Sequence, residues 1–213
     1  MSESKGIVIE EQELREMARP ARGAIQHIYL HWSGGHYGVN EDAYHLCVDK
    51  DGQVYANCSD FSEKKAHTWL RNSGSMAVSL LCGCDGNCWP PGNGNVRTIH
   101  AVRAGSSYAG PDDAIINFGE EPPTAEQIET MAKLVAILCE GLGLAINKDN
   151  VQTHCEIALK DHYGPGSGDP YSKWDLWFLP DYIHGGVLIP GGALLRGKAL
   201  FYRHEMKKLE QTA

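Results

Sequence analysis

The sequence has no run of basic residues, no long apolar stretch and no internal repeat. Among its 213 residues, 27 are acidic and 19 are basic, which gives a formal net charge of −8. This acidic excess is a poor match for a phosphate backbone, so we expect no nucleic-acid partner. Because no apolar run reaches the length of a membrane span, we also expect no membrane insertion.

The first twenty residues lack the basic segment and apolar core of a signal peptide. We therefore expect the protein to be cytoplasmic as synthesised, and to act outside the cell only if something else releases it. The seven cysteines are odd in number, which favours reduced thiols over a disulfide framework. Cys82, Cys84 and Cys88 cluster without a fourth ligand at ordinary zinc-finger spacing, and a local metal or disulfide clip remains an alternative there.

The first half of the chain predicts mainly strands. Residues 9–18 favour a short helix that ends before a proline, and the apolar run 25–32 predicts a buried strand. Two strand-like runs within 44–57 flank an Asp-Gly turn, which is a strong hairpin signal. Residues 76–82 predict another buried strand, and the Gly- and Pro-rich segment 83–123 is expected to be mostly loop.

The second half predicts helices. Thr124 and Gln127 form a capping-box pattern ahead of apolar residues at helical spacing. A strand end is expected at 151–154 and a terminal helix from about residue 193. Short strands mixed with one or two long helices indicate an α/β fold, a sheet covered by helices in a single domain.

Two of the ten histidines stand where predicted strands open into loops. His31 precedes Ser-Gly-Gly, and His154 precedes a long irregular segment. Such positions often carry functional groups, and neutral imidazole is the commonest nitrogen ligand of zinc. A hydrolytic zinc site needs a third ligand, and Asp169 lies in a turn-rich loop that Pro170 stiffens. Asp161 and His162 are rival ligands, and Asp175 is expected to cap or anchor the next segment.

Four stretches in order resemble the zinc-dependent N-acetylmuramoyl-L-alanine amidases, the family of peptidoglycan recognition proteins and phage amidase endolysins. They are YLHWSGG, YHLCVDKDGQVY, AHTWLRNSGSMAVSL and THCEIALKDHYGPGSGDPYSKWD. The resemblance covers about residues 25–180. It implies a catalytic domain over that range, with an N-terminal extension at 1–24 and a C-terminal, helical extension at 181–213. In this family a mixed central sheet is flanked by helices, and the zinc lies in a groove on one face of the fold.

The resemblance implies that Zn²⁺ is bound by His31, His154 and Asp169. Some members carry a catalytic glutamate at the position of Leu80, which this chain lacks, and others use the tyrosine that corresponds to Tyr44. His67 is expected to contact the substrate or its oxyanion.

Some relatives place an oxyanion-stabilising lysine two residues before the third ligand. With Asp169 as that ligand, Ser167 occupies this position and would be a neutral donor. Glu156 is expected to hydrogen-bond a ligand and orient it without binding the metal itself. Trp32, Trp69 and Trp89 could stack on sugar rings, although buried packing is the more common fate of tryptophan.

The implied function is hydrolysis of the amide between N-acetylmuramic acid and L-alanine in peptidoglycan, as in a phage or prophage endolysin. The alternatives are a cytoplasmic amidase that recycles soluble muropeptides and a peptidoglycan-binding module without catalysis. Stem-peptide preference and oligomeric state do not follow from the sequence.

Overall fold

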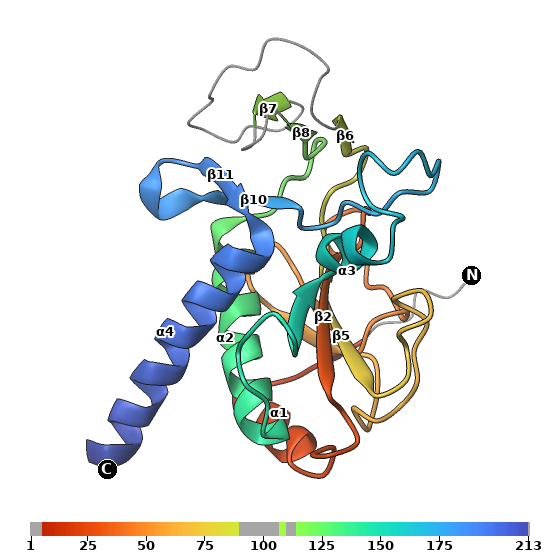
Figure 1. Cartoon of the computed structure of the whole chain (residues 1–213). Coiled ribbons are helices and arrows are strands. Elements are labelled where there is room, and N and C mark those ends of the chain that lie inside the picture. The colour runs from red at the N-terminus through yellow and green to blue at the C-terminus, as the bar shows by residue number, and fades with distance from the viewer. Residues whose placement is uncertain (1–5, 90–106, 110–113, 213) are drawn as a thin grey trace.

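The computed structural model describes residues 6–89, 107–109 and 114–212. A six-stranded sheet forms its centre (Figure 1). Its strands in spatial order are β1 (Ile7–Val8), β4 (Val54–Ala56), β3 (Leu46–Val48), β5 (Ser75–Leu80), β2 (His27–Trp32) and β9 (Val151–Thr153).

The sheet is mixed. β3, β5, β2 and β9 run parallel to one another, whereas β1, β4 and β3 pair antiparallel. β5 is buried along its whole length and β2 along nearly all of it, as expected for parallel strands covered on both faces. The mixed α/β sheet predicted from the sequence is confirmed.

The predicted hairpin joins β3 to β4. The backbone N–H of Asp49 donates to Gln53 O at 2.9 Å, and that of Gly52 donates to Asp49 O at the same distance. Gly52 has φ +83°, a conformation that favours glycine at this turn. The Asp-Gly signal therefore located the turn correctly.

Helix α2 (Ala125–Leu142) packs against the sheet and begins as the capping box predicts. Thr124 Oγ1 accepts from Gln127 N at 3.0 Å, and Gln127 Oε1 accepts from Thr124 N at the same distance. Gln127 Nε2 also donates to the carbonyls of Val48 and Leu81, which fixes the start of the helix over β3 and β5.

The segments predicted as extensions contribute to the same body. α1 (Glu11–Ala18) packs on α2, and β1 adds an edge strand to the sheet. α4 (Gly191–Thr212) lies alongside α2, and its C-terminal end reaches beyond the sheet (Figure 1). Among the described residues, no helix combines the length and the apolar character needed to cross a bilayer.

The structure adds two features to the sequence-based expectations. The described part of 83–123, expected to be mostly loop, also contains β6 (Asn87–Trp89), β7 (Ser107–Ala109) and β8 (Ile115–Asn117), which form a small antiparallel sheet. The C-terminal segment also begins with a hairpin of β10 (Phe178–Asp181) and β11 (Val187–Pro190), which are joined through a 3-10 helix, η2 (Tyr182–His184). Strands of three or four residues are too short to show a periodic pattern. Residues 90–106 and 110–113 of the expected loop lie outside the described residues.

Candidate metal centre

Strand register brings the two predicted histidines together. β2 and β9 pair in parallel with Leu30 opposite Thr153, so the next residues in that register are His31 and His154. His31 is fully buried, and His154 is 6% exposed. Their rings meet edge to face with centroids 4.7 Å apart.

His154 is the first residue of a short helix, α3 (His154–Lys160), and a capping box holds it there. Thr153 Oγ1 accepts from Glu156 N at 3.2 Å, and Glu156 Oε2 accepts from Thr153 N at 3.0 Å. The local sequence therefore turns the chain from strand to helix at the histidine itself. This turn fixes the backbone from which the imidazole projects.

Asp175 completes the group. Its Oδ2 lies 3.0 Å from His31 Nδ1 and 3.1 Å from His154 Nδ1. One ligand atom from each of the three buried residues lies within 4.8 Å of the others. Burial alone raises the pKa of the Asp175 carboxyl, but the adjoining His154 and His31 hold it below its ordinary value. Asp175 is therefore an ionised carboxylate between two imidazoles.

The third ligand predicted from the sequence, Asp169, does not lie in this group. Asp169 lies on an exposed loop, where its Oδ1 accepts from Tyr171 N at 2.7 Å. The turn residues around it, with Pro170 directly after, form a local side-chain-to-backbone turn. Asp161, the rival, forms a bidentate ion pair with Arg71 at 2.6 Å. Neither carboxylate joins the two histidines, whereas Asp175 does.

His67 lies against the same cluster. Thr68 Oγ1 bridges the two imidazoles, 3.0 Å from His67 Nδ1 and 3.2 Å from His31 Nε2. Burial, together with the neighbouring His31, lowers the pKa of His67 to about 2. Burial also lowers the pKa of His31 to about 4. Both rings are thus neutral near pH 7, the form in which imidazole binds a metal.

Tyr44 reaches the cluster from the loop before β3. Its ring lies 5.1 Å, centroid to centroid, from that of His31, and its hydroxyl donates to Trp32 O at 3.4 Å. Burial raises the pKa of Tyr44 above its ordinary value. The hydroxyl is therefore a hydrogen-bond donor throughout the neutral pH range.

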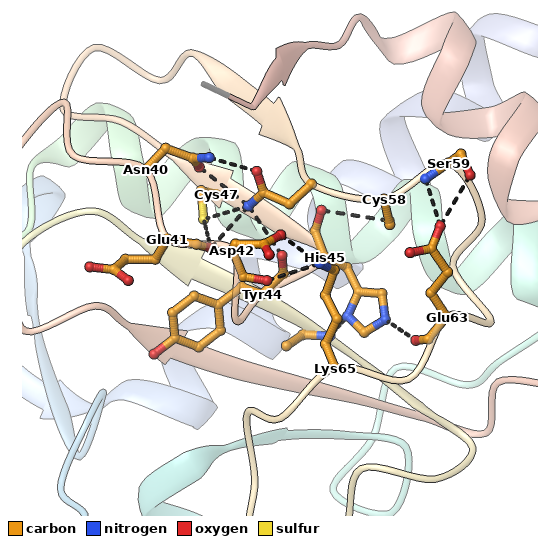
Figure 2. A network of polar contacts seen from close by, with 12 residues as sticks. Asn40, Glu41, Asp42, Tyr44, His45, Cys47, Cys58, Ser59, Glu63 and Lys65 are labelled. Carbon is orange, nitrogen blue, oxygen red and sulfur yellow. Dashed lines mark hydrogen bonds and ion pairs between the residues drawn. The ribbon is translucent and has the colours of Figure 1, made fainter. Parts of the chain in front are cut away.

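A polar network behind Tyr44 fixes this loop (Figure 2). Asn57 Nδ2 donates to the carbonyls of Glu41 and Tyr44 at 3.0 and 3.1 Å. His45 Nδ1 accepts from Ala77 N at 3.0 Å, and its Nε2 donates to a loop carbonyl at 2.7 Å. In Figure 2 the rings of Tyr44 and His45 point in different directions. His45 therefore anchors the loop, whereas Tyr44 lies against His31 of the cluster.

Two hollows border the histidines and share His67, His154 and Lys173. We name the first, of about 540 Å³, the apolar hollow, and the second, of about 310 Å³, the polar hollow. The residues particular to the apolar hollow include Trp69, Tyr163, Asp169 and Tyr171, and those particular to the polar hollow include Ser33, Gly34, Tyr44, Trp174 and Asp175.

Ser167 does not take the place predicted for it. Its side chain is exposed, its Oγ accepts from Asp169 N at 3.2 Å, and it lines neither hollow. The exposed Lys173 lines both hollows and stands two residues before Asp175. Leu80, at the position of the glutamate used by some relatives, is fully buried.

The donor set fits a zinc ion. Two imidazole nitrogens and one carboxylate oxygen, all buried, are the ligands that catalytic zinc sites use, and three protein ligands leave one position open. Thr68 Oγ1 beside His31 Nε2 supplies the outer contact that commonly orients a metal-bound imidazole. The residues present thus match the group that the sequence resemblance implies.

Residues 10–167 match the family model for N-acetylmuramoyl-L-alanine amidase. The match spans well over half of the sequence, so the chain belongs to the N-acetylmuramoyl-L-alanine amidase family. This membership supports an amidase activity on peptidoglycan. The matched region contains His31, Tyr44, His67 and His154 and ends before Asp175.

Two solved structures from Clostridium intestinale URNW are similar to this chain. The endolysin N-acetylmuramoyl-L-alanine amidase LysCS is 10% identical, with 63% of this chain and 71% of that one covered and a TM-score of 0.39. The N-acetylmuramoyl-L-alanine amidase LysC is 12% identical, with 74% and 81% covered and the same TM-score. Among curated proteins, no sequence matches this chain significantly. The family assignment therefore rests on the family model.

Proposed function

We propose that this protein is a zinc-dependent amidase that cleaves the bond between the lactyl group of N-acetylmuramic acid and L-alanine. The observation that carries the proposal is the convergence of His31, His154 and Asp175, buried and within 4.8 Å of one another, in a chain of this family. We propose these three residues as the metal ligands, with Asp175 in the role that the sequence had suggested for Asp169.

When bound, the metal lowers the pKa of a coordinated water and polarises the scissile carbonyl. The protein's part is to hold the ligands in place. Buried His31 has its pKa lowered to about 4, and the carboxyl pKa of Asp175 is also lowered. These two ligands are therefore ready to bind a cation at neutral pH without first losing protons.

The leaving nitrogen of L-alanine needs a proton, and the developing oxyanion needs a donor or a cation. Tyr44 has a hydroxyl held at the edge of the cluster, and its raised pKa makes it a donor or a water-orienting group rather than a base. We propose it for the proton-handling role. Lys173 lines both hollows beside His154 and supplies the positive charge that Ser167 lacks. His67, neutral and adjacent to His31, would serve as a substrate contact.

The cellular role we propose is that of a phage or prophage endolysin, which acts on the wall after release. Family membership supports hydrolysis of this amide, and a comparison of two substrates tests the cellular role. Intact sacculi and soluble anhydro-muropeptides contain the same amide, so the same centre would act on both. Faster hydrolysis of sacculi supports the endolysin role, and activity confined to the soluble fragments assigns a recycling role.

The deciding experiment for the reaction is the mass of the products formed from purified peptidoglycan by the zinc-loaded protein. Free stem peptides with an L-alanine amino terminus are expected, together with intact glycan strands. Shortened glycan strands would reject the amidase assignment. Binding to peptidoglycan with no released peptide in a zinc-replete assay would instead identify a recognition module.

A further inference from the structure

Aromatic side chains crowd the apolar hollow beside the candidate metal centre. Trp69 is 65% exposed and Tyr171 is 79% exposed, and both line the hollow that also contains His67 and His154. Large exposed apolar side chains that gather at one place, rather than singly, are typical of a binding surface. Tyr163 is buried in the same wall, and its ring meets that of Trp69 edge to face at 5.9 Å.

Hydrogen bonds and an ion pair order the loop that carries the exposed Trp69. Asn72 Oδ1 accepts from the backbone N–H groups of His67 and Thr68 at 3.1 and 2.8 Å. Leu70, next to Trp69, has φ +59° and is 80% exposed, a conformation that L-residues seldom adopt. Two bonds of 2.6 Å from Arg71 to Asp161 tie the loop to the end of α3. The exposed indole thus belongs to an ordered loop.

The two hollows differ in the charged side chains that line them. In the apolar hollow the exposed carboxylate of Asp169 stands beside three aromatic rings. A peptide stem that carries carboxylates would be repelled there, whereas a sugar ring offers C–H groups to aromatic faces and hydroxyls to a carboxylate. The polar hollow has no aspartate or glutamate besides the candidate ligand Asp175, and it adds Ser33 and Gly34 to the shared Lys173. Its aromatic side chains are buried or half-buried, unlike Trp69 and Tyr171; they are Trp32, Tyr44 and Trp174.

We propose that the apolar hollow is a carbohydrate subsite, in which Trp69 and Tyr171 stack on a sugar of the glycan strand. The polar hollow then receives the peptide stem, and the scissile amide lies between them at the metal centre. This assignment rests on the proposed amidase function for its biological meaning. The binding of the sugar itself does not require catalysis, so it can be measured separately.

The first test is calorimetric titration of the zinc-loaded protein with chitotetraose, an N-acetylglucosamine oligomer without a scissile amide. Trp69→Ala and Tyr171→Ala should each weaken binding by about tenfold, the effect of losing one stacking contact. Phe201→Ala is the matched control, because Phe201 is 61% exposed on α4 and lies outside both hollows, and it should leave the affinity unchanged. Absence of binding to the unmodified protein, or an equal loss in Phe201→Ala, overturns the proposal.

The second test compares kcat/KM for two substrate series, one with lengthening glycan on a fixed peptide and one with lengthening peptide on a fixed sugar. Trp69→Ala should abolish the gain from a longer glycan and preserve the gain from a longer peptide. The opposite pattern assigns the hollow to the stem and overturns the proposal. If the unmodified protein cleaves neither series, the proposed amidase function fails, while the chitotetraose titration still decides the sugar subsite.

Discussion

At the scale of single residues, substitutions of Asp175 and Asp169 are expected to affect zinc affinity differently. We predict that Asp175→Asn lowers zinc affinity about 100-fold or more, because the substitution removes a charged ligand from a buried group. Competition with a chromogenic chelator measures the affinity. Asp169→Asn is the matched control, since its carboxylate accepts from Tyr171 N on an exposed loop, and it should bind zinc normally. Zinc loss in Asp169→Asn but not in Asp175→Asn would reverse the assignment.

Tyr44 is the proposed residue for the proton-handling role, and His67 is the alternative candidate. We predict that Tyr44→Phe lowers kcat about tenfold or more without changing zinc content, because only a hydroxyl is lost and the ring beside His31 remains. Steady-state kinetics and elemental analysis of the same preparation check both parts. Full activity in Tyr44→Phe, together with inactivity of a zinc-loaded His67→Ala, would transfer the role to His67.

The sequence predicted two members of the candidate site and missed the third for a physical reason. His31 and His154 stand at strand ends, so their convergence follows from β-sheet geometry. Asp175 lies in an irregular segment, and only tertiary packing buries its carboxylate against both imidazoles. The turn residues around Asp169 are a strong local signal, but they describe a local Asx turn. The sequence contained one clue to Asp175. Lys173 stands two residues before it, the spacing at which some relatives place a lysine before the third ligand.

At the scale of elements, helix α4 supports the metal centre through Arg196. This buried guanidinium pairs with both Glu156 oxygens at 2.7 and 2.8 Å and donates to Val151 O at 2.9 Å. Glu156 is in turn the residue that caps the turn carrying His154. The C-terminal helix therefore braces the junction of β9 and α3, although it lies outside the family match.

We predict that Arg196→Met lowers zinc affinity about tenfold, the size of effect that outer-shell contacts commonly have, and also destabilises the metal-free protein. Lys198→Met is the matched control, because Lys198 on the same helix pairs with Glu129 of α2, away from the ligands. The control should lose stability without losing zinc affinity. Equal zinc affinity in both folded variants would show that Arg196 has only a structural role.

Elements with clear local signals were predicted well. The capping box of Thr124 and the Asp-Gly turn both encode their geometry in adjacent residues, and α2 and the β3–β4 hairpin follow. The strands β6, β7 and β8 carry no such signal, because three-residue strands are stabilised by their partners in space. Residues 193 onward were expected to be helical and form most of α4. What the sequence did not indicate is that this helix packs on α2.

At the scale of the whole molecule, the fold class follows from the alternation of strands and helices, but the strand order does not. The parallel set β3, β5, β2 and β9 places neighbours from distant parts of the sequence side by side. This order puts the ends of β2 and β9 together and thereby creates the centre. The same burial that excludes water from the histidines makes their charged forms unfavourable. Stability and pH are therefore coupled in this protein.

Burial lowers the pKa of three interior histidines: to about 4 for His31, to about 2 for His67, and below the ordinary value for His45. In the unfolded chain each has a pKa near 6.5. Since the unfolded state binds more protons below that pH, these groups stabilise the fold above about pH 6.5, and their contribution declines as the pH falls. The carboxyl pKa of Asp175 is also lowered, so its contribution is lost only at more acidic pH.

We predict that the free energy of unfolding of the metal-free protein is nearly constant above pH 7 and falls between pH 6.5 and 5. The slope is at most about 1.4 kcal/mol per pH unit for each histidine that stays neutral in the folded state. Urea unfolding at pH 7.5, 6.5, 5.5 and 5.0 measures it. His67→Asn removes one of these histidines and should reduce the slope by up to about 1.4 kcal/mol per pH unit, the equivalent of one proton. A stability that stays constant or rises from pH 7.5 to 5 would mean that the buried imidazoles gain protons in the folded protein, and with them a positive charge that opposes cation binding at the centre.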